Sequence, residues 1–233
     1  MRTGAILLCA GRGERLGADV PKAFVPLAGR PLFSWSLAAL QSCAEVKEIV
    51  VVGPVRTARE LLSACGASFD RIGAFVEGGA ERQQSVARGL GALSPDCDLV
   101  AVHDAARALV TPDVIGRAIA AALAHGAAIA AVPLADTLKA VEGDRIVATP
   151  AREGQWRAQT PQVFRRDWLE AAHAAAKRAA TDDAALVEAM GHEVRVAGGD
   201  ALNFKITTPA DLALAEAWLE KTARGAGISG RNA

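Results

Sequence analysis

The 233-residue sequence has no excess of charge of either sign, because 26 lysines and arginines are matched by 26 aspartates and glutamates. A protein that binds nucleic acid through a broad basic surface needs such an excess, so we expect no nucleic-acid partner. The balance still permits a local cationic pocket that binds a small anion.

Cysteines are few, and the four present show neither metal-ligand spacing nor a C-x-x-C pair. Cys9 and Cys97 adjoin or lie in apolar segments, which predicts buried thiols. The sequence also lacks a signal peptide and any apolar run long enough to span a bilayer. We therefore expect a cytoplasmic protein without a membrane partner.

Two common phosphate-binding motifs are absent as well. No segment reads G-x-x-x-x-G-K-[ST], and the glycines at 11, 13 and 17 have the spacing G-x-G-x-x-x-G instead of the dinucleotide spacing G-x-G-x-x-G. The sequence carries no serine–histidine–aspartate or cysteine–histidine signature either, which argues against covalent nucleophilic catalysis.

What the chain does contain is a regular alternation of short apolar segments with longer, alanine-rich amphipathic ones, and 51% of its residues are hydrophobic. The short segments predict strands at 4–9, 48–52, 72–76, 99–103 and 127–132. The longer ones predict helices at 32–43, 57–65, 81–92, 112–125, 166–178, 183–190 and 209–222. This alternation indicates an α/β fold, with a Rossmann-like, mostly parallel sheet flanked by helices, in a single domain over residues 1–224.

Residues 136–164 interrupt the alternation. The segment is too long for an ordinary loop and too poor in apolar residues for a second domain, and VEGDRI at 141–146 is typical of a hairpin tip. Residues 225–233 are small, polar and glycine-containing, which predicts a flexible tail.

The most informative segment is the glycine-rich turn after the first predicted strand, in LLCAGRGERL at 7–16. Gly11 and Gly13 allow backbone N–H groups to approach phosphate oxygens closely. Arg15 and Lys22 place two cations beside the turn, which suits the charge of a triphosphate. A purely structural turn is the alternative, but the two cations favour a site for a nucleoside triphosphate.

Four further segments carry a resemblance: GGAERQQS at 78–85, HDAAR at 103–107, QTPQ at 159–162 and KITTPADL at 205–212. With the glycine-rich turn they closely resemble the 2-C-methyl-D-erythritol 4-phosphate cytidylyltransferase family of the non-mevalonate isoprenoid pathway, from about Thr3 to Leu219. That family lies within the nucleotide-diphospho-sugar transferase-like nucleotidyltransferases. The resemblance implies transfer of CMP from CTP to methylerythritol phosphate, with release of pyrophosphate.

The resemblance also implies roles for individual residues. It implies catalytic roles for four of them, with Arg15 and Lys22 stabilising the transition state and Arg152 and Lys205 positioning the substrate. The residues implied for nucleotide binding are Ala10, Gly11, Gly13, Gly79, Ala80, Ser85 and Asp104. The residues implied for substrate binding are Asp104, Arg107, Thr137, Arg152, Thr160, Thr181 and Lys205. The chain departs from common family residues at Glu14, Ala80 and Ala108.

Asp104 is the candidate metal ligand. It follows a predicted strand and could be a turn residue, but Mg²⁺ commonly takes one carboxylate together with phosphate oxygens. We therefore expect Mg²⁺ or another divalent cation as cofactor. His103 is expected to pack and hydrogen-bond, because a phosphate nucleophile is already mostly dianionic at neutral pH and needs no general base.

In the resembled family the segment matching 136–164 forms a β-arm that embraces a second subunit. This implies a homodimer in which Arg152 serves the neighbouring subunit's site. Two alternatives stay open: a cytidylyltransferase for another sugar-alcohol phosphate, such as ribitol 5-phosphate, and a nucleotide-binding module without catalysis.

Overall fold

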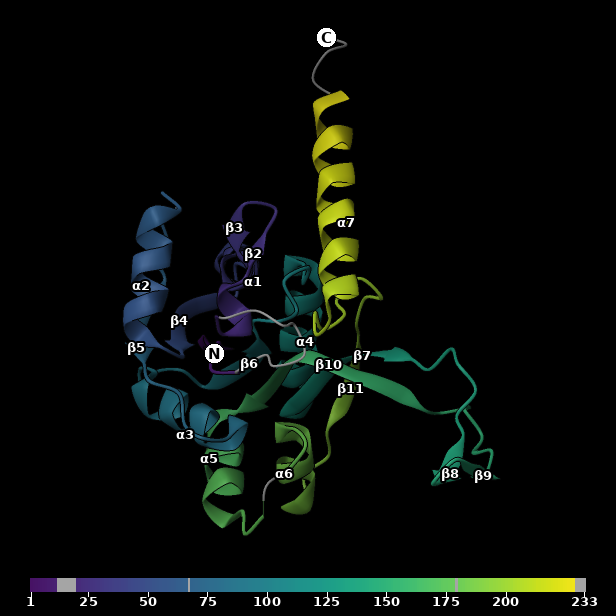
Figure 1. Cartoon of the computed structure of the whole chain (residues 1–233). Helices are drawn as coiled ribbons and strands as arrows, with labels where there is room; N and C mark the ends of the chain where they lie inside the picture. Colours follow the sequence, from purple (N-terminus) through teal and green to yellow (C-terminus); the bar gives the residue numbers. More distant parts are fainter. Residues whose placement is uncertain (12–19, 67, 179, 229–233) are drawn as a thin grey trace.

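A seven-stranded sheet forms the centre of the molecule in the computed structural model, which describes residues 1–11, 20–66, 68–178 and 180–228 (Figure 1). Across the sheet the strands are ordered β11 (Arg195–Gly198), β7 (Ala127–Pro133), β10 (Trp156–Arg165), β6 (Leu99–Asp104), β1 (Thr3–Leu8), β4 (Val46–Val52) and β5 (Ile72–Val76). All neighbouring pairs are parallel except those of β10, which runs antiparallel to both β6 and β7. The predicted α/β fold with a mostly parallel sheet is confirmed.

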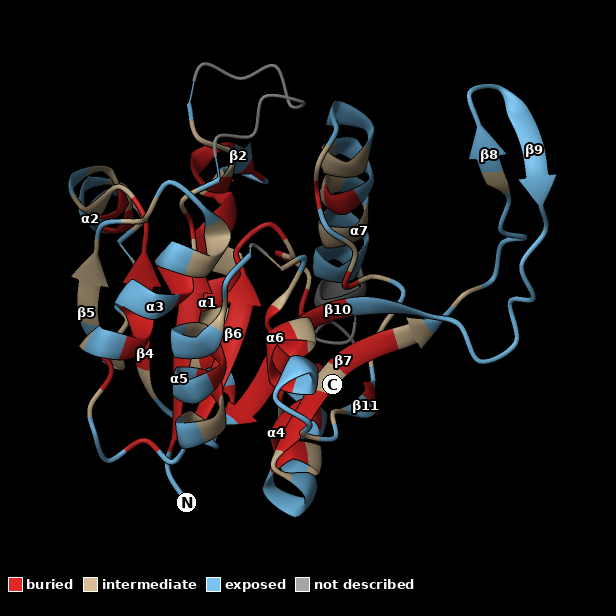
Figure 2. Ribbon diagram, turned by 90° about the horizontal axis from the view of Figure 1, so that it is seen from below, coloured by how far each residue is buried: buried red, intermediate tan, exposed pale blue. Residues whose placement is uncertain are grey.

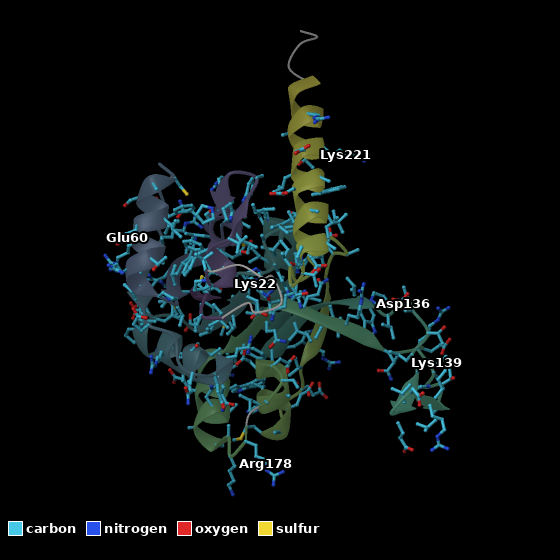
Figure 3. The ribbon with its side chains drawn as sticks, in the orientation of Figure 1. Lys22, Glu60, Asp136, Lys139, Arg178 and Lys221 are labelled. Carbon is cyan, nitrogen blue, oxygen red and sulfur yellow. The ribbon has the colours of Figure 1, made fainter. Side chains whose placement is uncertain are left out.

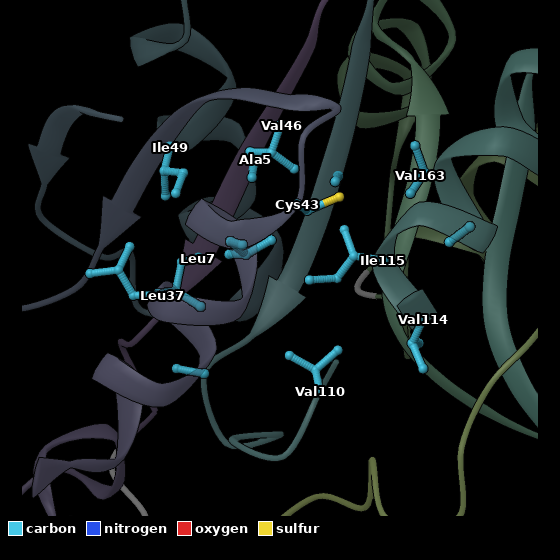
Figure 4. Close-up of a cluster of buried hydrophobic side chains, with 14 of the residues drawn as sticks. Ala5, Leu7, Leu37, Cys43, Val46, Ile49, Val110, Val114, Ile115 and Val163 are labelled. Carbon is cyan, nitrogen blue, oxygen red and sulfur yellow. The ribbon is translucent and has the colours of Figure 1, made fainter. Parts of the chain in front are cut away.

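Helices cover both faces of this sheet, because successive side chains of each strand point to opposite faces. Ala5 and Leu7 of β1 belong to a core with α1 (Leu32–Ser42), α2 (Val55–Ala64) and α4 (Pro112–His125), part of which is drawn in Figure 4. Ile6 belongs to the opposite core, with α3 (Arg82–Ala92), α5 (Arg166–Ala175) and α6 (Asp183–Ala189). The central strands, such as β4 and β6, are accordingly among the most buried parts of the molecule (Figure 2).

The last helix, α7 (Pro209–Ile228), stands beside a small hairpin and extends away from the sheet (Figure 1). The hairpin consists of β2 (Pro26–Leu27) and β3 (Arg30–Pro31), which follow the short 3-10 helix Lys22–Phe24. Ala215 of α7 packs with Leu27 and Ile206 in a third, smaller core. The boundary predicted at residue 225 therefore falls within a helix, and residues 229–233 lie outside the described part of the chain.

All five predicted strands and all seven predicted helices are present, with shifts at several ends. The sequence did not predict β11, which is an edge strand of four residues, nor β2 and β3, which have two residues each. None of the described helices combines the length and the apolar character needed to cross a lipid bilayer.

The extended segment exists but is shorter than predicted. Strands β8 (Ala140–Glu142) and β9 (Arg145–Ala148) form the predicted hairpin tip, and the segment projects from the sheet (Figure 2). The predicted end at residue 164 is wrong, because the second half of β10 is a buried strand between β6 and β7. The buried Gln159, Thr160 and Gln162 gave this strand a polar sequence, which hid it from the apolar pattern.

His103 lies in β6 and is completely buried. Its Nδ1 lies 2.9 Å from Thr160 Oγ1, and its Nε2 is buried without a hydrogen-bond partner among the described residues. Burial lowers the pKa of the His103 imidazole to about 4, because it disfavours the charged ring. His103 is therefore a neutral core residue, in accordance with the role expected from sequence.

We expect this histidine to make the free energy of unfolding pH-dependent. The unfolded chain binds a proton at His103 below pH ~6.5, whereas the folded chain does so only below about pH 4. The stabilisation is thus complete above pH ~6.5 and is lost as pH falls toward 4, amounting to about 2.5 kcal/mol between pH 7 and pH 4.5.

The measurement is urea unfolding of the native chain and of His103→Asn at both pH values. Carboxylates contribute equally to both proteins, so the variant should lose less stability on acidification by about that amount. Equal losses in the two proteins would contradict a neutral His103.

Candidate active site

Two cavities lie where strands β1 and β6 end, the edge at which parallel sheets commonly bind ligands. The first, the glycine-turn cavity, has a volume of about 320 Å³, within the range of roughly 300–1,000 Å³ typical of small-molecule sites. The second, the Thr160 cavity, is lined largely by β10 and by the two residues just before α6, Thr181 and Asp182.

The cavities bring together most of the residues that the sequence singled out. The glycine-turn cavity is lined by Ala10, Gly11, Lys22, Gly79, Ala80, Ser85, Asp104 and Lys205 from that set. The Thr160 cavity is lined by Asp104, Arg107, Thr160, Thr181 and Lys205 from it. Asp104 and Lys205 line both, so the two groups of residues predicted for nucleotide and for substrate share one wall.

The shared wall is an ion cluster around Asp104. Lys205 Nζ donates to Asp104 Oδ2 at 2.7 Å, and Arg82 Nε donates to Oδ1 at 3.3 Å. The backbone N–H of Asp104 donates to Thr160 Oγ1 at 3.1 Å, which fixes the end of β6 against β10. Each carboxylate oxygen of Asp104 therefore has a cationic partner, and Arg82 also lines both cavities.

These contacts determine the charge states in the wall. Burial alone would raise the pKa of the Asp104 carboxyl, but Lys205 and Arg82 outweigh it, so the pKa lies well below its ordinary range. Burial likewise acts to lower the pKa of Arg82, whereas the carboxylates of Asp183 and Asp104 outweigh it and raise that pKa. The wall is thus an ionised Asp104 carboxylate held between the side chains of Lys205 and Arg82.

Two glycines allow close packing at the rim of the glycine-turn cavity. A Cβ on Gly78 would overlap the Ala10 side chain, and a Cβ on Gly79 would overlap Gln84. Ser85 Oγ accepts a hydrogen bond from the Gly79 N–H at 3.0 Å, and Gln84 Oε1 accepts one from the Ala80 N–H at 2.9 Å. The loop before α3 is consequently held in one shape, with its backbone at the cavity.

Arg107 braces the floor of the Thr160 cavity. Its Nη1 donates to the Asn203 carbonyl at 2.8 Å and its Nη2 to the Ala158 carbonyl at 3.2 Å. Asn203 in turn donates to the Thr160 carbonyl at 2.9 Å, and the Ile206 N–H pairs with the Ala106 carbonyl. This network brings the segment that carries Lys205 against the end of β6.

Four predicted residues are not placed in either cavity. Gly13 and Arg15 lie outside the described residues. Thr137 and Arg152 line neither cavity and belong to the projecting segment, where Arg152 Nη1 donates to the Ala135 carbonyl at 2.6 Å. Figure 3 shows Asp136 and Lys139 of that segment away from Lys22.

Three side chains of the charge network were not predicted from the sequence. Arg82, Asp183 and His173 form a chain of contacts behind Asp104. Arg82 stands within the quoted segment GGAERQQS, so its position beside the predicted nucleotide residues was an available signal. Asp183 and His173 come from α6 and α5, and no local pattern connects them to Arg82.

The donor set bears on a metal ion. Among the residues that the structure describes, no three histidine, cysteine or acidic side chains cluster as a metal cage would require. Asp104 is the carboxylate that lines both cavities, with Glu81 in the glycine-turn cavity and Asp182 in the Thr160 cavity. This fits Mg²⁺, which commonly binds through one or two carboxylates together with substrate phosphates.

Comparison with known proteins identifies the family. The family model described as 2-C-methyl-D-erythritol 4-phosphate cytidylyltransferase matches residues 3–221. A relative of that name from Frankia casuarinae is 46% identical over 94% of this chain and 82% of its own length. A second, from Geobacter metallireducens, is 42% identical over 95% of this chain and 99% of its own length.

Solved structures agree. That of 2-C-methyl-D-erythritol 4-phosphate cytidylyltransferase from Thermus thermophilus is 40% identical, with a TM-score of 0.76 over 94% of this chain and 100% of its own. That of 4-diphosphocytidyl-2C-methyl-D-erythritol synthase from Anaerococcus prevotii is 28% identical, with a TM-score of 0.81 over 94% and 98%. The motifs, the fold and these relatives together show that the chain belongs to the 2-C-methyl-D-erythritol 4-phosphate cytidylyltransferase family.

Proposed function

We propose that the two joined cavities are where this chain transfers CMP from CTP to 2-C-methyl-D-erythritol 4-phosphate, giving 4-diphosphocytidyl-2-C-methyl-D-erythritol and pyrophosphate. The observation that carries this assignment is the shared wall of Asp104, Arg82 and Lys205. With CTP in the glycine-turn cavity and methylerythritol phosphate in the Thr160 cavity, their phosphates would meet at this wall, which holds cations for both.

The chemistry is an in-line displacement at the α-phosphorus of CTP. A phosphate oxygen of methylerythritol phosphate forms the new bond, while the bond from the α-phosphorus to the bridging oxygen breaks and pyrophosphate leaves with that electron pair. A phosphate monoester is mostly dianionic at neutral pH, so no side chain needs to remove a proton. His103 fits this scheme, because it is buried and neutral.

The protein's task is then to position charge. Lys22 lines the glycine-turn cavity, and together with Arg15 it would stabilise the negative charge that develops on the triphosphate. Lys205, Thr160 and Thr181 line the Thr160 cavity and would hold the second substrate. Arg107 would contribute mainly by bracing that cavity, since two of its nitrogens already donate to backbone carbonyls.

Cytosine would be recognised by the loop before α3. Gly79 and Ala80 present backbone groups there, and Ser85 and Gln84 keep the loop in one shape. The N–H groups of Gly79 and Ala80 already donate to Ser85 and Gln84, so the backbone carbonyl oxygens of the loop, fixed in advance, would distinguish the exocyclic groups of the bases.

A divalent cation, Mg²⁺ or another, would bind mainly to the triphosphate, with Asp104 as its protein ligand. It would neutralise phosphate charge. Lys205 and Arg82 each donate to one oxygen of Asp104, so the cation would compete with these side chains for the carboxylate.

The projecting segment would join two copies of the chain into a homodimer. In the described part of the chain it carries a set of exposed large apolar side chains: Leu138, Val141, Ile146, Val147 and Trp156. Exposed apolar side chains gathered in this way are typical of an interaction surface. Arg152 and Thr137 lie on this segment away from their own cavities, which supports their reaching the site of the second copy. A cytoplasmic location fits the four unpaired cysteines.

The reaction can be tested by measuring pyrophosphate release with paired substrates. Release should require CTP, methylerythritol phosphate and Mg²⁺ together, and replacing CTP by ATP, GTP or UTP should lower kcat/KM by at least about 10²-fold. EDTA should abolish the activity and Mg²⁺ should restore it. As a control for the site, Lys22→Ala should lower kcat by about 10²-fold.

Each rival function has its own result in this assay. Preference for ribitol 5-phosphate would reassign the acceptor, and binding of CTP without pyrophosphate release would indicate a nucleotide-binding module. Comparable release with ATP would contradict the assignment of the base-binding loop.

The composite site can be tested by subunit exchange between Arg152→Ala and Lys22→Ala proteins, each expected to be nearly inactive alone. If Arg152 serves the other subunit, a mixed dimer has one site with both defects and one intact site. Equal random mixing gives about half mixed dimers, so about a quarter of normal activity should return. The double variant mixed with itself is the control, and no recovery despite exchange shown by mass spectrometry would refute the composite site.

A further inference from the structure

A pair of buried side chains, Asp183 and His173, lies behind the shared wall and has no part in the reaction described above. The Asp183 side chain is 1% exposed and that of His173 is 6% exposed. Neither residue lines the glycine-turn cavity or the Thr160 cavity, and neither was predicted for the site. A buried carboxylate is unfavourable unless it is paired and hydrogen-bonded, so the partners of Asp183 indicate what it does.

Asp183 is fixed from two sides. Its Oδ1 lies 2.9 Å from His173 Nε2 on α5. Its backbone N–H donates to Gln162 Oε1 at 3.1 Å, and the Ala184 N–H donates to the same oxygen at 3.2 Å. The start of α6 is thereby held against β10, and the remaining oxygen of the carboxylate is aimed at Arg82.

The hydrogen bond of Arg82 to Asp183 is shorter than its hydrogen bond to Asp104. Its Nη1 donates to Asp183 Oδ2 at 2.6 Å, the length of a strong charge-assisted hydrogen bond, whereas its contact with Asp104 is 3.3 Å. Its Nη2 donates to no described residue. The guanidinium is thus held firmly by Asp183 through Nη1 and more weakly by Asp104 through Nε. Its Nη2 is left to donate to a ligand in the cavities that Arg82 lines.

We infer that Arg82 is a phosphate-binding residue of the reaction and that Asp183, backed by His173, is its positioning residue. When the Asp104 carboxylate binds the cation, Asp183 keeps the Arg82 guanidinium at the wall that the two cavities share. There its Nε and Nη2 bind phosphate oxygens of the two substrates. The inference rests on the proposed function and adds to it the residues that maintain the junction.

The alternative is that the three side chains only stabilise the packing of α3, α5 and α6. A double-mutant cycle separates the two, because residues that act through one another have non-additive effects. Arg82→Gln should lower kcat/KM for both substrates by about 10²-fold, the effect of removing one preorganised charged donor. Asp183→Asn should lower it by about 10-fold or more. The double variant should be no worse than Arg82→Gln alone.

Two variants of His173 test its part in the same array. His173→Gln keeps an N–H donor near the Nε2 position and should retain most of the activity, whereas His173→Leu should lower kcat/KM by about 10-fold. Glu170→Gln is the matched control, because it removes the charge from the 2.7 Å pair with Arg166 on the same helix and should leave kcat/KM unchanged.

The double variant also keeps the test valid if Asp183→Asn does not fold, since it removes both charges of the Arg82–Asp183 pair together. In that case the inference is supported if the double variant has the same kcat/KM as Arg82→Gln and if the two His173 variants behave as stated. Calorimetric titration with CTP measures the same double-mutant cycle by binding affinity, without turnover. If the wild-type chain binds CTP but releases no pyrophosphate, the proposed function is wrong, while the positioning role can still be tested by binding. Additive losses, or wild-type kcat/KM in Asp183→Asn, would overturn the positioning role.

Discussion

The Asp104 carboxylate accepts hydrogen bonds from Lys205, 101 residues later in the chain, and from Arg82, 22 residues earlier. A buried carboxylate requires such partners, and the cations in turn are kept at fixed points by it. The start of α3, the end of β6 and the segment before α7 therefore have to meet at one place. Both cavities depend on that meeting, because each uses the cluster as a wall.

The antiparallel strand β10 makes the arrangement possible. It lies between β6 and β7, and it places Thr160 where its hydroxyl contacts both the Asp104 N–H and His103. Gln162 of the same strand holds the start of α6, and Gln159 holds the segment at Asp200 and Asn203. Because β10 begins at the projecting segment, one strand connects that segment to the Thr160 cavity and, through Thr160, to the Asp104 wall that the two cavities share.

The sequence predicted the parallel strands and their helices because apolar periodicity reports burial directly. The motifs and the family resemblance also singled out many residues that line the two cavities, among them Gly11, Asp104 and Lys205. The sequence failed at β10, since Gln159, Thr160 and Gln162 are buried by hydrogen bonding and not by apolar character. It failed at Asp183 and His173 for a related reason: their link to Arg82 exists only after three helices have packed, and no local spacing encodes it.

The central claim is that one carboxylate organises the binding of both substrates, and Asp104→Asn tests it most directly. The amide keeps the shape of the side chain but removes the charge that pairs with Lys205 and Arg82. Steady-state kinetics with each substrate varied in turn should show kcat/KM lowered by at least about 10-fold for CTP and for methylerythritol phosphate alike, in a variant whose fold is verified by circular dichroism. A loss confined to one substrate, or no loss at all, would contradict the claim.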